Sequence, residues 1–236
     1  MTIAIVTGAA RGIGFRIASR LAEDGHHPVL VDLDPSVTEA AEELGGIGLQ
    51  ADIASSEGRA DVASSVRAAQ KEAGRLAVLV NNAGITRDAQ IKNMAEVDFR
   101  LVTRVNLGSM YGLITELADE IVDGGAVINV SSRAQLGNFG QFNYAVSKGG
   151  VIGLTRALAL RHAPRLRMNV VGPGFISTVM TDAMPESVRE KIISAVPMDR
   201  AGQPDDIAEA AAWLASDRSG YITGQVVYCC GGRSYA

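Results

Sequence analysis

Short apolar runs alternate with longer amphipathic stretches along the chain. The apolar runs, which predict strands, cover residues 3–7, 28–33, 47–51, 77–81, 126–131, 167–171 and 225–229. The stretches between them, which predict helices, cover residues 13–24, 36–44, 55–73, 95–122, 144–163 and 204–215. The apolar runs are near-continuous rather than strictly alternating, which is typical of strands buried on both faces. The pattern therefore predicts an α/β fold, a doubly wound parallel sheet with helices on both faces.

Composition narrows the class of protein further. The 236 residues (24.7 kDa) are 47% hydrophobic and 20% charged, which excludes a disordered or fibrous chain. Neither an internal repeat nor a Pro/Gly-rich linker interrupts the pattern, so residues 1–236 are predicted to form a single domain. The net charge of −4 gives no general attraction for nucleic acid or anionic lipid. No apolar run approaches the ~18–20 residues that span a bilayer, so we expect a cytoplasmic protein with neither nucleic-acid nor membrane partners.

Three glycines follow the first predicted strand, where a helical pattern begins. Gly8, Gly12 and Gly14 have the spacing G-x-x-x-G-x-G, which lets the backbone turn sharply and approach a diphosphate at the helix N-terminus. An unliganded tight turn also uses glycine, so the spacing alone is not specific. Asp32 ends the second apolar run, where a carboxylate can accept hydrogen bonds from a ribose, and Asp34 is the alternative. Together these residues predict a dinucleotide-binding site.

Asp32 also bears on which dinucleotide binds. A carboxylate at this position would repel a 2′-phosphate, which favours NAD over NADP. Arg11, in the glycine turn, works in the opposite sense, because a guanidinium could neutralise that phosphate. The carboxylate would lie directly against the added charge, so NAD is the preferred cofactor and NADP stays open.

A tyrosine and a lysine form the candidate catalytic pair. Tyr144 and Lys148 are four residues apart and share one face of a predicted helix. A phenol has an ordinary pKa near ~10, and a neighbouring ammonium lowers it toward neutral pH. The phenol could then donate a proton to a carbonyl oxygen as a hydride reaches the carbon, or do the reverse. The pair follows a strand that ends in Ser131 and Ser132, one of which is expected to hydrogen-bond the substrate oxygen.

Several motifs occur in a recognisable order along the chain. They are T-G-A-A-R-G-I-G at 7–14, Asp52-Ile53, N-N-A-G at 81–84, Asn106, Ser132, Tyr144-x-x-x-Lys148 and Pro173-Gly174. Together they resemble the short-chain dehydrogenase/reductase family over essentially the whole chain. The stretches 81–88 and 140–144 look most like 3-oxoacyl-thioester reductases. The resemblance implies a Rossmann-type sheet, a small carbonyl or alcohol substrate and a homotetramer.

The resemblance also implies roles for individual residues. Asn106 is expected to hold a water that relays protons to Lys148, and Lys148 to hydrogen-bond the nicotinamide ribose. Asp52 is expected near the adenine ring. The full set of expected cofactor-binding residues is Gly8, Arg11, Gly12, Ile13, Gly14, Asp32, Asp52, Ile53, Asn81, Ala83, Gly84, Tyr144, Lys148, Pro173, Gly174, Ile176 and Thr178.

The two serines cannot both face the site, because successive strand residues point to opposite sides of a sheet. Counting back from Tyr144 without a gap selects Ser131, whereas counting forward along the strand selects Ser132. In the family that the chain resembles, the second serine of such a pair is the catalytic one. We therefore predict Ser132, with a one-residue deletion in the loop 133–139.

Other candidate features indicate little further chemistry. The three histidines lack metal-ligand spacing, so no metal is expected. Cys230 stands where the family commonly has a carboxylate, and we interpret it as a buried, inert thiol. Arg165 and Arg167 could attract a phosphorylated carrier, but solvated basic residues are the simpler interpretation.

These residues predict an oxidoreductase that transfers a hydride between NAD(H) and a secondary alcohol or ketone. The predicted catalytic set is Asn106, Ser132, Tyr144 and Lys148. The alternative is an NADPH-dependent 3-oxoacyl-thioester reductase, which the stretch 81–88 favours. The segment 175–200 is the expected substrate segment, and its aliphatic residues favour an apolar substrate portion. A third hypothesis is a dinucleotide-sensing or scaffold protein without catalysis, which the complete catalytic set argues against.

Overall fold

Strands from both halves of the chain join in one parallel sheet. The computed structural model describes residues 1–235, apart from the side chain of Met180. The sheet has seven strands in the order β3-β2-β1-β4-β5-β6-β7, and each neighbouring pair is parallel. The strands are β1 (Thr2–Thr7), β2 (His26–Asp32), β3 (Ile47–Gln50), β4 (Leu76–Asn81), β5 (Ile121–Val130), β6 (Arg167–Pro173) and β7 (Val226–Cys229). This order confirms the predicted doubly wound sheet, whose winding reverses between β1 and β4.

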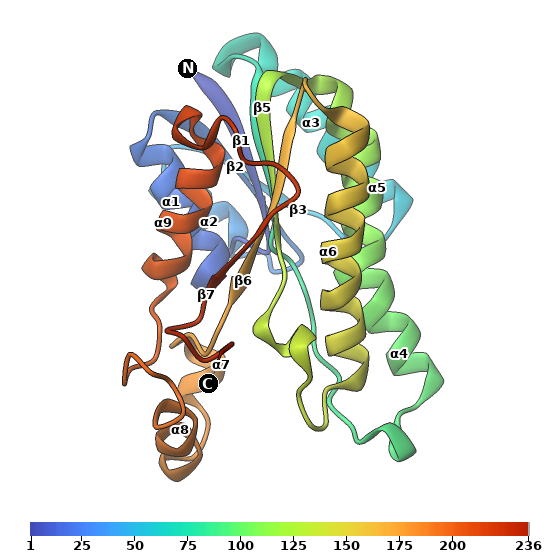
Figure 1. The fold of residues 1–236 in the computed structure, drawn as a ribbon. Helices are drawn as coiled ribbons and strands as arrows, with labels where there is room; N and C mark the ends of the chain where they lie inside the picture. Colours follow the sequence, from blue (N-terminus) through green and yellow to red (C-terminus); the bar gives the residue numbers. More distant parts are fainter. Residues whose placement is uncertain (236) are drawn as a thin grey trace.

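Helices cover both faces of the sheet (Figure 1). One face carries α1 (Gly12–Glu23), α2 (Val37–Glu43) and α9 (Pro204–Ala215), and the other carries α3 (Ser56–Ala73), α4 (Glu96–Thr103), α5 (Ser109–Leu117) and α6 (Phe142–His162). The short helices α7 (Val179–Asp182) and α8 (Glu186–Ile193) lie beyond the carboxyl ends of the strands. Short 3₁₀ turns occur at η1 (Ile91–Asn93), η3 (Ala118–Glu120), η4 (Arg133–Leu136) and η5 (Asp217–Ser219).

The buried core has two halves because alternate strand residues face opposite sides. In β1, Ala4 and Val6 pack with residues of α1 and α9. Ile3 and Ile5, from the same strand, pack with residues of α3 and α5. The near-continuous apolar runs of the sequence are thus explained by burial on both faces of the sheet.

Two boundaries predicted from the sequence are wrong. The helix predicted over 95–122 is divided into α4 and α5 by a π-helical turn, η2 (Arg104–Gly108). Strand β5 begins at Ile121 rather than at residue 126, because its pairing with β4 shifts register. Leu76 pairs with Ile121, whereas Val78 pairs with Ala126, so residues 122–125 form a bulge. The polar and glycine residues of this bulge hide the start of the strand from the apolar pattern.

Arg165 and Arg167, at the amino edge of the sheet, hydrogen-bond backbone carbonyls where neighbouring helices and strands begin or end. This corrects the interpretation of these two arginines as solvated residues. Arg167 is 9% exposed and donates to the carbonyl oxygen of Leu214 at 2.7 Å and to that of Ala215 at 3.1 Å, at the end of α9. Arg165 donates two hydrogen bonds of 2.7 Å to carbonyls at the start of η3 and of β5. The last carbonyls of a helix have no partner within it, and a cation satisfies them well.

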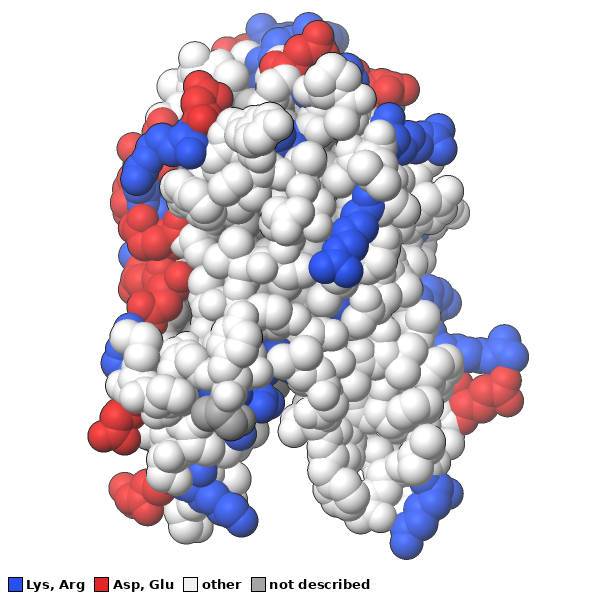
Figure 2. Space-filling model, viewed as in Figure 1, with Lys and Arg blue, Asp and Glu red and all other residues white. Residues whose placement is uncertain are grey.

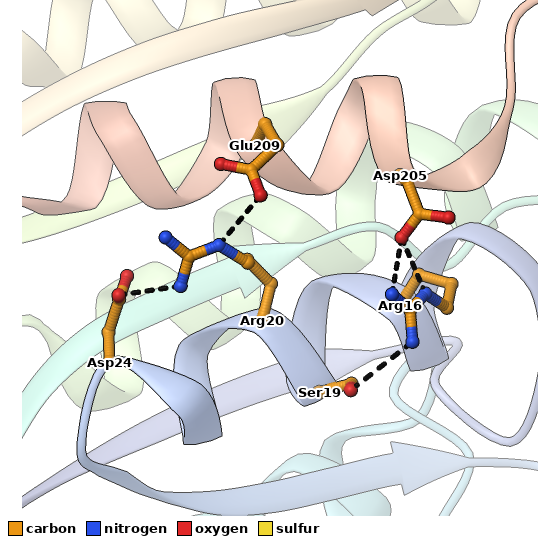
Figure 3. A network of polar contacts seen from close by, with 6 residues as sticks. All are labelled: Arg16, Ser19, Arg20, Asp24, Asp205 and Glu209. Atoms are coloured by element: carbon orange, nitrogen blue, oxygen red, sulfur yellow. Dashed lines mark hydrogen bonds and ion pairs between the residues drawn. The ribbon is translucent and has the colours of Figure 1, made fainter.

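Ion pairs join α1 to α9 (Figure 3). The Nε atom of Arg16 donates to Asp205 at 2.8 Å, and that of Arg20 donates to Glu209 at 2.8 Å. Such exposed pairs contribute only about 0–1 kcal/mol each to stability. Here the ion pairs fix the position of α1 relative to α9. This matters because α1 starts at the glycine turn and α9 starts where the 175–200 segment returns to the sheet.

Candidate active site

The glycine turn lies at the carboxyl end of β1, and close contacts require two of its glycines. Gly8 has φ +64°, and a Cβ there would lie 2.8 Å from the Cα atom of Ala83. A Cβ on Gly14 would lie 2.1 Å from the carbonyl oxygen of Gly8. Gly12 has φ +60° and begins α1, and apart from its chain neighbours and the backbone of its own helix no described atom lies within 4 Å of the position of its Cβ. This close packing below an open helix N-terminus fits a diphosphate group.

Asp32, at the end of β2, fastens the glycine turn. Its carboxylate accepts the Ala10 N–H at 3.0 Å and the Asp34 N–H at 3.1 Å. Asp34 in turn forms an ion pair of 2.8 Å with Arg11. The N–H of Ser36 and the guanidinium of Arg11 hold the pKa of Asp34 below its ordinary value. The rim of the turn therefore carries two carboxylates, and its one arginine is already paired.

Helix α6 brings Tyr144 and Lys148 to the carboxyl end of β5. Lys148 is 3% exposed, and its Nζ donates to the carbonyl oxygen of Val130 at 2.8 Å. The Nζ atom lies 5.7 Å from the centroid of the Tyr144 ring. Burial lowers the pKa of Lys148 to about 8. The ammonium is therefore still mostly charged at pH 7, although it lies in a poorly solvated position.

The pKa of Tyr144 differs from the expectation that its lysine neighbour lowers it. Burial raises the pKa of the phenol, because a phenolate loses more hydration than a phenol does. A hydrogen bond with Ser132 works against this increase, and the negative charge of Asp88 adds to it. Tyr144 is therefore protonated at neutral pH and is set up as a proton donor.

The two serines after β5 point in opposite directions. The Oγ atom of Ser131 donates to the carbonyl oxygen of Lys148 at 2.7 Å, within the buried contact between β5 and α6. The Ser132 hydroxyl lies in the hollow with Tyr144 and works to lower the pKa of that phenol, and its Oγ accepts the Ala134 N–H at 3.1 Å. Of the two alternatives left open by counting, Ser132 is thus the serine that lies beside the phenol.

Asn106 lies in the π-helical turn η2 and is fully buried. Its Oδ1 accepts the Ile85 N–H at 2.8 Å, and its Nδ2 donates to the Ile85 carbonyl at 3.0 Å. Its Nδ2 also lies 3.1 Å from the Oγ atom of Ser147, one residue before Lys148. Single π turns inside α-helices often mark functional positions. The turn here directs the amide of Asn106 toward the catalytic face of α6.

A hollow of about 250 Å³ brings many of the predicted residues together. Its predicted members are Ile13, Gly84, Ser132, Tyr144, Lys148, Pro173, Gly174, Ile176 and Thr178. Figure 2 shows a recess at the lower end of the molecule, with uncharged atoms along its right side and some basic atoms along its left side. Asp52, Ile53 and Asn81 are outside this lining: Asp52 accepts the Ala54 N–H at 2.9 Å, and the Asn81 amide donates to Asn129 at 2.8 Å.

Sequence reasoning missed polar residues that organise the site. Asn82 lines the hollow, and its amide donates to the carbonyls of Thr7 and Gly8 at 3.0 Å each, so it joins β4 to the glycine turn. Ser147 is fully buried, and its Oγ donates to the carbonyl of Tyr144 at 2.8 Å. The signal for Ser147 was a polar residue on the inner face of α6, one residue from Lys148.

Two further properties bear on the class of protein. Within residues 1–235, no helix combines the length and the apolar composition that crossing a membrane requires. The same residues contain no group of three or more His, Cys, Asp or Glu side chains that could hold a metal ion.

A nucleotide-binding turn and a proton donor at one edge of a doubly wound sheet define an NAD(P)-dependent oxidoreductase that acts on a carbonyl group. A family model described as enoyl-(acyl carrier protein) reductase matches residues 8–234. The chain belongs to the short-chain dehydrogenase/reductase family, as its motifs predicted.

Three curated relatives are similar over nearly their whole lengths. Acetoacetyl-CoA reductase of Allochromatium vinosum is 41% identical over 232 residues, which cover 94% of each chain. The 3-oxoacyl-[acyl-carrier-protein] reductase FabG of Thermotoga maritima is 39% identical over an alignment of 238 positions, which covers 98% of this chain and 96% of the relative. The (2S)-[(R)-hydroxy(phenyl)methyl]succinyl-CoA dehydrogenase subunit BbsD of Thauera aromatica is 37% identical over an alignment of 241 positions, which covers 98% of this chain and 96% of the relative.

Proposed function

We propose that this protein reduces the 3-oxo group of a 3-oxoacyl thioester, with NADH as the preferred cofactor and Tyr144 as the proton donor. The observation that carries the proposal is that Ser132, Tyr144 and Lys148 line one hollow, in which burial raises the pKa of Tyr144 and keeps its phenol protonated. A protonated phenol can deliver its proton to a carbonyl oxygen, which is what a reductase requires. Two of the relatives are named for acetoacetyl-CoA and 3-oxoacyl-carrier substrates, which supports the thioester.

Each member of the catalytic set has a distinct task in this proposal. Ser132 lines the same hollow as Tyr144 and orients the substrate oxygen toward the phenol. Lys148 supplies a positive charge near the ring, which stabilises the phenolate that remains after proton donation. Asn106, whose amide is fixed by hydrogen bonds with the backbone of Ile85, would hold a water that relays protons to Lys148. Bound NAD(P)H would supply the hydride.

The preference for NADH rests on the charges around the glycine turn. Gly8, Gly12 and Gly14 would hold the diphosphate, and Asp32 would accept hydrogen bonds from the adenosine ribose. A 2′-phosphate would meet the carboxylates of Asp32 and Asp34, while the guanidinium that could neutralise it is paired at 2.8 Å. NADPH use, as in the alternative hypothesis, requires that this pair open.

The segment 175–200 is proposed to cover the substrate. It contains α7 and α8, and Phe175, Ile176, Thr178 and Thr181 from its first part line the hollow. Val179 and Met198 are exposed aliphatic side chains in the same segment, which suits an acyl chain. In this proposal residues 1–236 work as one domain that holds cofactor and substrate together.

We further propose that the protein assembles as a homotetramer. An apolar surface on α4, η2, α5 and α6 includes Phe99, Leu107, Tyr111 and Leu154, and Tyr111 is 54% exposed. Further copies of this chain would cover that surface. Light scattering at micromolar concentration is expected to give about four times the 24.7 kDa of one chain, and a monomer mass would contradict the proposal. The cytoplasmic location stays a prediction.

The deciding experiment separates cofactor binding from turnover. NADH and NADPH are titrated by fluorescence, and acetoacetyl-CoA reduction is then measured with each. The Tyr144→Phe variant is expected to keep cofactor affinity while turnover falls by orders of magnitude. A non-catalytic sensor would show no turnover to lose, and tighter NADPH than NADH binding would overturn the cofactor preference.

A further inference from the structure

One wall of the catalytic hollow is a segment without regular structure. Gly84, Ile85 and Thr86 line the hollow together with Tyr144 and Lys148. Residues 84–88 belong to no helix or strand. The wall nevertheless packs closely, because a Cβ on Gly84 would lie 3.3 Å from the Lys148 Nζ. Its position must therefore come from side-chain hydrogen bonds.

Two buried asparagines supply those bonds. Asn106 binds the beginning of the wall through both the N–H and the carbonyl of Ile85. Asn143 binds its end: the Nδ2 atom donates to the Arg87 carbonyl at 2.8 Å. The family resemblance covered Asn106 but gave no role to Asn143, which is equally buried at 0% exposure.

The other end of the Asn143 amide holds the catalytic residue. Its Oδ1 accepts the N–H of Tyr144 at 2.7 Å, in the first turn of α6. A single buried side chain thus links the wall of the hollow to the backbone of the proton donor. Because both the Oδ1 and the Nδ2 atom of Asn143 are hydrogen-bonded, the link fixes the orientation of the amide as well as the distance that it spans.

A second contact lies on the exposed side of the same link. The Nε2 atom of Gln141 donates to the Asp88 carboxylate at 2.9 Å, and Gln141 also forms a backbone bridge with Ala89. The stretches 81–88 and 140–144, which carry the resemblance to 3-oxoacyl-thioester reductases, are therefore tied together in space.

We propose that Asn143 is a positioning residue for the reaction, because it sets the distance between Tyr144 and the wall that the substrate touches. The inference rests on the proposed role of Tyr144 as proton donor. Rates of reaction depend steeply on such distances, and a displacement of about 1 Å can lower turnover ~10²-fold.

The Asn143→Asp variant tests this link most directly. An aspartate keeps an acceptor for the Tyr144 N–H but turns a second oxygen toward the Arg87 carbonyl, where two acceptors repel each other. The hydrogen bond to the Tyr144 N–H is retained and the tie to the wall is lost. Asn93→Asp, the same change at an exposed position in η1, is the matched control.

The assay uses acetoacetyl-CoA with NADH. For Asn143→Asp we expect kcat to fall ~10²-fold, with the Kd for NADH within twofold of wild type. The primary isotope effect on kcat, measured with NADH deuterated at the transferred position, is expected to rise because the chemical step becomes rate-limiting. A purely structural role predicts a lower unfolding temperature with kcat within threefold of wild type, and that result would overturn the inference.

A second variant keeps the test decisive if Asn143→Asp does not fold. Gln141→Leu removes the contact with Asp88 at a partly exposed position, and kcat is expected to fall about tenfold with an increased isotope effect. Unchanged kcat in that variant would also overturn the inference. A wild-type protein without activity would overturn the proposed function. An active wild type with unaffected variants would overturn only the role of Asn143, so the two failures are distinguishable.

Discussion

Each edge of the parallel sheet contains a buried cation, and the two cations differ in how many hydrogen bonds they form. At the carboxyl edge, Lys148 makes one hydrogen bond among the described residues, to Val130, and burial lowers its pKa to about 8. At the amino edge, Arg167 donates to the carbonyls of Leu214, Ala215 and Ser216. Neither cation has a carboxylate within ion-pair distance among residues 1–235.

The difference lies in what each edge leaves unsatisfied. The amino edge uses its arginine donors on backbone carbonyls, so its interactions serve stability alone. The carboxyl edge keeps a poorly solvated ammonium, which costs stability but leaves hydrogen-bonding capacity for a ligand. A substitution of the cation at the carboxyl edge should therefore lower activity and raise stability, whereas one at the amino edge should lower stability and leave activity unchanged.

Lys148→Met is expected to have the largest effect. Turnover should fall ~10³-fold or more, because the charge that stabilises the phenolate is lost. Stability should rise by about 2 kcal/mol at pH 7: the lowered pKa corresponds to about 3 kcal/mol of destabilisation, and the unpaired Val130 carbonyl offsets about 1 kcal/mol. Steady-state kinetics and denaturant unfolding measure the two effects.

The pH dependence of the free energy of unfolding distinguishes this electrostatic effect of Lys148 from a change in packing. The pKa of Lys148 is lower in the folded state than in the unfolded state, so its destabilising effect is complete below pH 8. As pH rises through 8 toward the unfolded value of about 10.5, the penalty disappears. The stability advantage of Lys148→Met should therefore vanish over that interval, and an advantage independent of pH would contradict the prediction.

Arg167→Met tests the amino edge. Removal of the guanidinium leaves several carbonyls at the end of α9 without donors, which is expected to lower the free energy of unfolding by about 3 kcal/mol. The kcat of the folded protein should not change. Arg167→Lys, which keeps the charge but fewer donors, should recover part of the loss. A loss of kcat without a loss of stability would remove the contrast between the edges.

These two cations also mark what the sequence can and cannot predict. Lys148 was identifiable because its partner, Tyr144, lies four residues away on one helix. The partners of Arg167 are backbone carbonyls and the Ser219 hydroxyl, 47 to 52 residues away, and they leave no trace in the residue pattern. The order of apolar runs predicted the parallel sheet, since each run had to be buried on both faces.

Burial is the property that sequence reasoning missed at the site itself. The spacing of Tyr144 and Lys148 predicted their proximity, but the expectation of a lowered phenol pKa considered only charge. In the structure desolvation is the largest influence on Tyr144 and raises its pKa. Ser132 was already predicted over Ser131 from the resemblance, and the contact of Ser131 with the Lys148 carbonyl adds a physical reason for that choice.

A smaller effect is expected on the exposed rim of the carboxyl edge, where Asp34→Ala should release Arg11. The affinity for NADPH should increase about fivefold, with the Kd for NADH within twofold, because a repelling carboxylate is lost and a guanidinium becomes available. Adding Arg11→Ala in the same chain should reverse the gain. Fluorescence titration decides it, and an unchanged affinity for NADPH would mean that Asp32 alone sets the preference.

The smallest expected effect concerns backbone strain within the substrate segment. Asp199 has φ +52°, a left-handed conformation that favours glycine, and its N–H donates to the Val196 carbonyl at 2.8 Å. Asp199→Gly should stabilise the protein by about 0.5 kcal/mol, because the strain of about 1 kcal/mol is partly offset by the greater entropy of glycine in the unfolded chain. Thermal unfolding should show an increase of about 1–2 °C.

Activity of Asp199→Gly then decides how far the contrast between the edges extends. Unchanged kcat with higher stability would confine the functional cost of the carboxyl edge to Lys148 and its surroundings. A fall in kcat would mean that the 175–200 segment needs the restricted backbone at Asp199 to close over substrate. A lower unfolding temperature would contradict the prediction, since it would require a stabilising contact of the Asp199 side chain that outweighs the strain.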